Sequence, residues 1–172
     1  IQVAGENPDE HHFAKHSGCS SERTLKYKSH EYYENEFGNK AEICLEDDRM
    51  RAVIHYQFYE SSDTVRSWTV VTNIASEPLG LEYVSSFAYT GISEGQFDGV
   101  YVYIPNNVCV NEMNWRRHSL SELGFTKNSI KRHSVYNTGT WSTKEFLPMA
   151  IIENTAADNT YIFQIENNGS WQ

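Results

Sequence analysis

Apolar and polar residues alternate with a period of two along much of the chain, which is the pattern of strands that bury one face. The clearest run is RAVIHYQFYE (51–60), in which Ala, Ile, Tyr and Phe share one face. Similar runs cover residues 68–74, 79–89, 100–104 and 161–166. We expect these five segments to be β-strands.

Turn-forming residues separate the runs at intervals of about ten residues. Short strands with polar turns between them favour two antiparallel sheets packed as a sandwich or a barrel. We therefore predict an all-β fold, an antiparallel β-sandwich. The turn segments are Asp47-Asp48, Ser61-Ser62-Asp63, Ser76-Glu77-Pro78, Gly91 to Gly95, Pro105-Asn106-Asn107, Asn137-Thr138-Gly139, Ala157-Asp158-Asn159 and Asn167-Asn168-Gly169.

Two segments depart from the strand pattern. Residues 1–24 are polar and weakly patterned, so we expect a loop-rich region that leads to a strand around Leu25 and Tyr27. SLSELGF (119–125) has the spacing of one short helical turn, and Gly124 is a suitable residue to end it. The sequence has no internal repeat and no low-complexity tract, so we expect a single domain over residues 1–172.

The charge and the hydropathy of the sequence argue against two classes of partner, nucleic acids and membranes. The net charge of −9 argues against nucleic acid, because phosphate binding needs clustered lysine and arginine side chains. Neutral and cationic ligands stay open, and simple solubility also explains the acidity. No stretch approaches the roughly 18 uninterrupted apolar residues of a membrane span, so we expect no membrane partner.

The cysteines indicate the compartment. Cys19, Cys44 and Cys109 show no CxxC pairing, and an odd number without regular spacing is not typical of a disulfide framework or a zinc site. We therefore expect a reducing, cytoplasmic location. Ile1 is not followed by the basic and apolar regions of a signal peptide, and a signal lost upstream stays open.

Histidines and carboxylates give no clear catalytic pattern. His12 and His16 in HHFAKH have the i, i+4 spacing of helical metal ligands, but an HExxH glutamate and a helical context are missing. We interpret this cluster, with His11, as an exposed polar loop, and His55 as a packing residue. No GxSxG motif and no glycine-rich phosphate cradle occurs. The acids Glu94 and Asp98 flank a glycine-rich turn and are interpreted as solvated.

Three tryptophans are more suggestive. Trp115, Trp141 and Trp171 lie in polar, turn-rich surroundings instead of in apolar strands. Because an indole has a large apolar face and an N–H donor, it can stack on a sugar ring at such a position or become buried in an interface. Capping the edge of a sandwich is the structural alternative.

Four aromatic and polar blocks carry a resemblance to a known family. They are YQFYESSDTVRSWTVVTNIASEPLGLEYVSSFAYTGI, NWRRHSLSELGF, YNTGTWSTKEFLPMAIIEN and TYIFQIENNGSW. In this order they resemble the N-terminal β-supersandwich domain of glycoside hydrolase family 36, whose members are largely α-galactosidases. The resemblance extends over nearly the whole chain.

The resemblance implies that the chain is a fragment of a larger enzyme. In the family a (β/α)₈ barrel follows this domain and holds the two catalytic aspartates of a retaining mechanism, which uses no metal or other cofactor. We therefore expect no catalytic residue in this chain. The ends of the sequence agree, because Trp171 opens a new aromatic segment one residue before the chain stops.

The family also implies a role for the part that is present. Its N-terminal domain packs against its own catalytic barrel, helps to build homo-oligomers and contributes to the rim of the galactose site, where α-galactosides of the melibiose or raffinose type bind. Many relatives place a tryptophan near the sugar at the position that resembles Cys109, and a thiol cannot stack on a sugar as an indole does. Galactosyl transfer is therefore an alternative to hydrolysis. The candidates for the substrate rim are Tyr101, Tyr103, Asn107, Cys109 and Trp141, and those for an interface are Trp115 and Trp171.

Two other functions stay open. The sandwich could bind carbohydrate by itself, or it could only pack and oligomerise. If strands are missing, unpaired backbone groups on edge strands also predict self-association.

Overall fold

The computed structural model describes residues 1–6, 24–95, 97–127 and 131–172. Two compact units, Ile1–Tyr89 and Thr90–Gln172, make up the chain. Every strand pairing in the described residues is antiparallel, and none of these residues forms a helix with enough length and apolar character to cross a membrane. The all-β, antiparallel architecture predicted from the sequence is confirmed.

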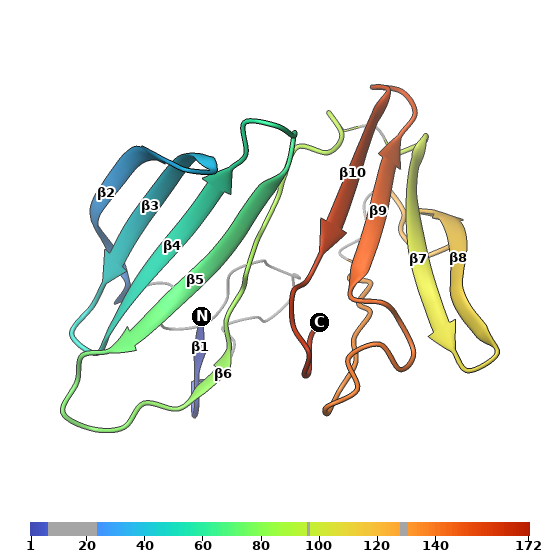
Figure 1. Cartoon of the computed structure of the whole chain (residues 1–172). Helices are drawn as coiled ribbons and strands as arrows, with labels where there is room; N and C mark the ends of the chain where they lie inside the picture. Colours follow the sequence, from blue (N-terminus) through green and yellow to red (C-terminus); the bar gives the residue numbers. More distant parts are fainter. Residues whose placement is uncertain (7–23, 96, 128–130) are drawn as a thin grey trace. The chain divides into compact units, whose positions relative to one another are not determined.

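The first unit is built on a four-stranded sheet in the order β2-β3-β4-β5 (Figure 1). Each strand pairs with the next one along the chain, so the sheet is a meander with β2 and β5 at its edges. A small second sheet pairs β1 with β6. The strands of this unit are β1 (Gln2–Val3), β2 (Lys26–Asn35), β3 (Gly38–Glu46), β4 (Met50–Phe58), β5 (Val65–Asn73) and β6 (Leu81–Tyr83).

The register gives the large sheet of the first unit two different faces, because directly opposed residues point to the same side. Ile54 lies opposite Ile43 and Thr69 on the apolar face. On the other face, His55 lies opposite Glu42 and Trp68. The apolar face is partly covered by segment 85–88, since the Ser67 hydroxyl donates to the carbonyl of Ser86 at 2.9 Å.

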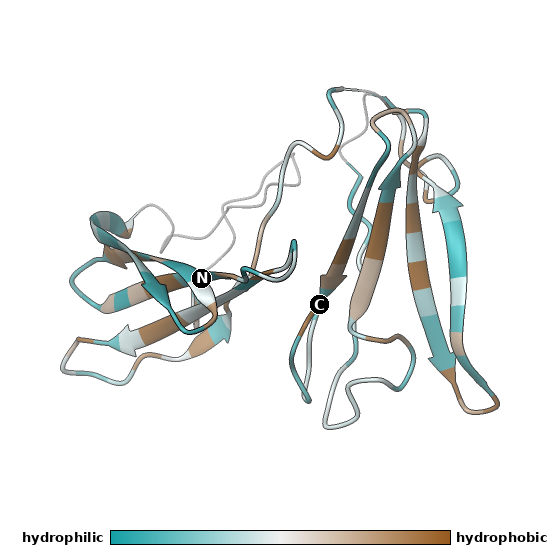
Figure 2. Ribbon diagram, turned by 45° about the horizontal axis from the view of Figure 1, so that its top comes forward, coloured by the Kyte–Doolittle hydropathy of each residue, from teal (hydrophilic) through white to brown (hydrophobic). Residues whose placement is uncertain are grey.

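The second unit is built on a four-stranded sheet in the order β10-β9-β7-β8 (Figure 1). Hydrophobic and more hydrophilic bands alternate along β7 of this sheet, as a strand with two different faces requires (Figure 2). Its buried apolar residues include Val100, Ile104 and Trp171. The strands are β7 (Val100–Val108), β8 (Asn111–Ser119), β9 (Met149–Asn154) and β10 (Asn159–Gln164).

Most of the predicted strands are found. The runs 51–60, 68–74, 100–104 and 161–166 correspond to β4, β5, β7 and β10. The prediction of a strand over residues 79–89 is wrong in part, because only Leu81–Tyr83 of this run forms a strand. Its later residues lie against the apolar face of the sheet and join no ladder, although their alternating aromatic pattern is that of a strand.

Segment 119–125 forms one capped turn and no helix. The Ser119 hydroxyl accepts the Glu122 N–H at 3.2 Å, and the Glu122 carboxylate accepts the Ser119 N–H at 2.6 Å, which is a capping box. Gly124, at φ 81°, ends the turn, and the N–H of Phe125 donates to the Leu120 carbonyl at 2.9 Å. The prediction that Gly124 ends this segment is confirmed. Because Gly124 follows the capping residue Ser119 so closely, only a single turn forms between them.

Candidate functional site

The segment 137–147, which precedes β9, carries Trp141 and is referred to here as the Trp141 loop. Asn137 holds it from inside and is only 4% exposed. Its Nδ2 donates to the carbonyls of Ser142 and Phe146, both at 2.7 Å, and its Oδ1 accepts the Glu145 N–H at 3.2 Å. One amide side chain thus satisfies three backbone groups that would otherwise need water.

Asn107 and Trp171 hold the same loop from two other elements. The backbone N–H of Asn107, near the end of β7, donates to the Glu145 carbonyl at 2.8 Å. Its side-chain Nδ2 donates to the Thr143 carbonyl. The indole N–H of Trp171 donates to the Ser142 carbonyl at 2.7 Å. Trp171 also exchanges two backbone hydrogen bonds with Asn137, and its side chain is 8% exposed, so it is buried within its own unit.

Trp141 itself is exposed on this fixed loop. Its side chain is 62% exposed, although the residues that hold the loop are buried or half-buried. Tyr136, just before the loop, is 57% exposed. An exposed indole on a rigid loop offers an apolar face and an N–H donor, and it loses little backbone freedom when it binds a ligand.

Tyr101 and Tyr103 belong to a different cluster. The guanidinium of Arg117 lies 3.3 Å from the centre of the Tyr101 ring. It donates to Glu153 at 3.0 Å and to the Tyr103 hydroxyl at 3.0 Å, and that hydroxyl donates to Glu153 at 2.8 Å. The hydrogen bonds from Tyr103 and Arg117 lower the pKa of Glu153. Since the Arg117 guanidinium covers part of the Tyr101 ring, the cluster is mainly a cross-strand ion-pair network.

The last two candidates lie elsewhere in the second unit. Cys109 is exposed at the tip of the β7–β8 hairpin, beside Val110 at φ 72°. Trp115 is half-buried on β8, opposite Pro105. Hydrogen bonds therefore bring Asn107 and Trp171 to the Trp141 loop, and none of the bonds described here connects Tyr101 or Tyr103 to it.

A second polar cluster, which we call the Glu42 cluster, was not predicted. It lies on β2–β5 and comprises Tyr33, Lys40, Glu42, His55 and Trp68. Glu42 accepts the Tyr33 hydroxyl at 2.8 Å and lies 2.7 Å from Lys40 Nζ and 3.0 Å from His55 Nδ1. The His55 ring stacks on Trp68 with 4.8 Å between ring centres. Each member falls on one face by alternation, but only the strand register reveals that they meet.

The electrostatics of the Glu42 cluster point to stabilisation. The hydrogen bond from Lys40, followed by the one from Tyr33, lowers the pKa of Glu42 to about 2. The same contact raises the pKa of Lys40. A carboxylate with a lowered pKa and an amine with a raised one suit neither a general acid nor a nucleophile. We therefore interpret the cluster as an ionised network that fixes the register of the sheet.

Replacing Glu42 by glutamine is expected to lower the free energy of unfolding by about 2 kcal/mol near neutral pH. The pKa of Glu42 is lowered from 4.5 to about 2 in the folded state, so the stabilisation is complete above pH 4.5 and is lost as the pH falls toward 2. Urea unfolding between pH 7 and pH 2.5 measures both effects. Glu77→Gln, which removes the same charge from an exposed turn, should change the free energy of unfolding near neutral pH by less than about 0.5 kcal/mol. An equal slope in wild type and Glu42→Gln contradicts this prediction.

Other sequence candidates form no site in the part of the chain that is described. His11, His12, His16 and Cys19 lie outside the described residues. Cys44 and Cys109 are free thiols. Within residues 1–6, 24–95, 97–127 and 131–172, no three His, Cys, Asp or Glu side chains form a group that could hold a metal ion.

Comparisons with protein-family models, with curated proteins and with solved structures found no match for this chain. The functional interpretation therefore depends on the residues and contacts described above.

Proposed function

We propose that this chain is a non-catalytic β-domain of a glycoside hydrolase similar to the family 36 α-galactosidases. Its own contribution is a sugar contact through the Trp141 loop. The complete protein hydrolyses terminal α-galactosides by a retaining mechanism, with catalytic aspartates in a barrel outside this chain. It works in the cytoplasm, needs no cofactor and assembles as a homo-oligomer.

The observation that supports the sugar contact is the exposure of Trp141 on a loop that is fixed from three sides. A buried asparagine, a strand-end asparagine and a buried tryptophan determine the loop conformation, yet the second indole stays 62% exposed. A large apolar side chain that only stabilised the loop would be buried, as Trp171 is. Its exposure on a rigid support favours a ligand or a partner surface.

The chemistry of the loop suits a sugar. The C–H face of a galactose ring can stack on the indole, and the ring hydroxyls can reach the indole N–H and the polar groups of the loop. One stacking contact supports only weak binding. We therefore expect a dissociation constant in the millimolar range, which corresponds to a binding free energy of roughly −4 kcal/mol.

Two alternatives differ in what Trp141 touches. If the chain is an independent carbohydrate-binding module, it binds sugar without the barrel. If it is only a packing domain, Trp141 contacts protein and binds no sugar. Trp141→Ala in the full-length enzyme separates the sugar-rim function from packing. If Trp141 contacts sugar at the rim, the substitution raises KM and leaves assembly intact. If Trp141 only packs against protein, the substitution disrupts assembly and leaves normal kinetics per folded subunit.

The sugar contact can be tested directly by titrating the chain with galactose and with raffinose. Calorimetry and tryptophan fluorescence measure the binding. We expect heat at millimolar sugar and a change in tryptophan emission, and Trp141→Ala should remove both. Tyr83→Ala, which removes another exposed aromatic ring, is the matched control and should bind like wild type. If wild type binds neither sugar, or if Trp141→Ala binds as well as wild type, this chain has no sugar contact at Trp141.

A further inference from the structure

The outer side of β2 is an edge at which a second copy of this chain can pair. Strand β2 (Lys26–Asn35) is the longest strand of the sheets, and only β3 pairs with it among the described residues. An edge strand presents a row of backbone N–H and C=O groups, which pair readily with another strand. This edge therefore has the backbone chemistry of a self-association surface.

The charges of β2 are divided between its two halves. Lys26 and Lys28 lie in the first half, and Glu31 and Glu34 lie in the second. Two copies of β2 that run antiparallel place the basic half of each strand beside the acidic half of the other. A parallel arrangement would place like charges together, which is unfavourable for directly opposed residues. The charge pattern therefore selects the antiparallel pair.

Two of these side chains, Lys28 and Glu31, are accessible to a partner strand. Lys28 Nζ lies 3.0 Å from Glu46 within the same sheet, but the Lys28 side chain is still 62% exposed. A second carboxylate can thus approach it from the edge. The residue opposite Glu31 in β3 is Glu42, which already has Tyr33, Lys40 and His55 around it. A basic residue from a partner strand is therefore a favourable neighbour for Glu31.

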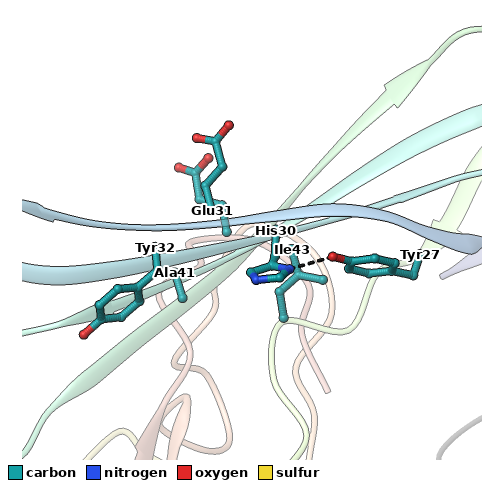
Figure 3. A pocket seen from close by; sticks show the side chains of 7 residues that line it. Tyr27, His30, Glu31, Tyr32, Ala41 and Ile43 are labelled. Atoms are coloured by element: carbon teal, nitrogen blue, oxygen red, sulfur yellow. Dashed lines mark hydrogen bonds between the residues drawn. The ribbon is translucent and has the colours of Figure 1, made fainter.

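Aromatic side chains line the same edge on the apolar face. Tyr27, His30 and Tyr32 point to one side of β2, and Glu31 points to the other (Figure 3). The two tyrosines are 61% and 66% exposed, and the three side chains line a hollow of about 340 Å³ whose floor is Ala41 and Ile43. The Tyr27 hydroxyl lies 2.6 Å from His30 Nδ1, which fixes part of this wall. A neighbouring β2 would bring a second set of these rings alongside and cover apolar surface on both copies.

The other sheet edges lack this combination. Strand β5 has one charged residue, Arg66, and β10 has none. Strand β8 also separates acidic from basic residues, but its backbone is interrupted by Met113 at φ 52°, and its Arg117 is bound to Glu153. Strand β2 has an irregularity too, a register shift between Tyr27 and Ser29, but its residues 29–35 pair with β3 without interruption and its opposite charges lie at an exposed edge.

We propose that two copies of this chain dimerise by antiparallel pairing of β2 with β2, which joins their four-stranded sheets into one continuous sheet. The contact is isologous, so each charge pair occurs twice about the two-fold axis. It is independent of any sugar contact at Trp141, and the two proposals can fail separately.

Charge reversal tests the dimer with the full chain. Sedimentation equilibrium of the wild type should show association to a dimer with a dissociation constant of about 100 μM. This value places the contact in the weak class of interfaces. Lys26→Glu/Lys28→Glu and Glu31→Lys/Glu34→Lys should each raise the dissociation constant at least tenfold. Mixing the two variants in equal amounts should restore the dimer as a heterodimer. Arg66→Glu, a charge reversal on the opposite edge strand, should dimerise like wild type.

The two variants also separate specific pairing from general repulsion. The first makes the acidic chain more negative and the second makes it less so, so general repulsion predicts opposite effects, whereas the β2 contact predicts that both weaken association. Circular dichroism checks that each variant keeps its β structure. A monomeric wild type, a dimer that survives both reversals, or a mixture that stays monomeric overturns the proposal.

Discussion

Replacing Gly38 by alanine is expected to lower the free energy of unfolding of the first unit by about 3 kcal/mol or more. Gly38 begins β3 after the β2–β3 turn and has a φ of 130°, a conformation that residues with a Cβ rarely adopt. An alanine Cβ at this place would lie 2.5 Å from the Phe58 carbonyl oxygen and 3.0 Å from the Glu60 nitrogen. Both are backbone atoms, so neither can move aside by a change of rotamer.

Gly5 provides a matched control within the same unit. It also has a positive φ, 84°, but an added Cβ meets no atom within 4 Å. Gly5→Ala therefore reports the cost of the backbone conformation alone, about 1–2 kcal/mol. Urea unfolding, with hydrogen exchange of the β3 and β4 amides, measures both variants. Equal losses in Gly38→Ala and Gly5→Ala would show that the Phe58 contact does not limit this position.

The Gly38 substitution also connects the two features of the first unit. Strand β3 carries Lys40 and Glu42, and it is the strand that holds β2 at the edge. A shift at Gly38 therefore moves the Glu42 cluster and the proposed dimer surface together. We expect the variant to lose part of the pH-dependent stabilisation by Glu42 as well as the β2 contact.

Local alternation predicts four strands, β4, β5, β7 and β10, but it gives no prediction for β3, β8 and β9. In β4, the side chains of Ala52, Ile54 and Tyr56 share the apolar face, and the run is found where the sequence places it. The alternation fails for strands without a buried face. Strand β2, KYKSHEYYEN, is almost entirely exposed, and pairing with β3 holds it in place. The sequence predicts a strand around Leu25 and Tyr27, which lies at the beginning of β2.

Long-range contacts account for the rest of what the sequence could not reveal. Trp141 and Trp171 both lie in polar, turn-rich segments, and their local sequence does not show which of them is buried. In the structure one is 62% exposed and the other is 8% exposed, because only Trp171 pairs with Asn137. Similarly, the sequence predicts a packing role for His55, and its ring does stack on Trp68, but only the register reveals that it also meets Glu42.

Replacing Trp171 by alanine is expected to lower the free energy of unfolding of the second unit by about 3–5 kcal/mol. The substitution removes a buried ring and the hydrogen bond from its Nε1 to the Ser142 carbonyl. The backbone bridge to Asn137 depends on the same packing, so the Trp141 loop should also lose its fixed conformation. Urea unfolding measures the stability, and hydrogen exchange of residues 139–147 measures the order of the loop.

Trp171→Phe separates packing from hydrogen bonding at this position. Phenylalanine keeps an aromatic ring but cannot donate to Ser142, whose carbonyl still accepts from Asn137. This variant should therefore lose less, about 1–2 kcal/mol, and keep the loop protected from exchange. If the proposed sugar contact exists, Trp171→Ala should weaken galactose binding although it leaves Trp141 in place, whereas Trp171→Phe should retain most of it. Binding that persists in the alanine variant with an unprotected loop would mean that Trp141 needs no rigid support.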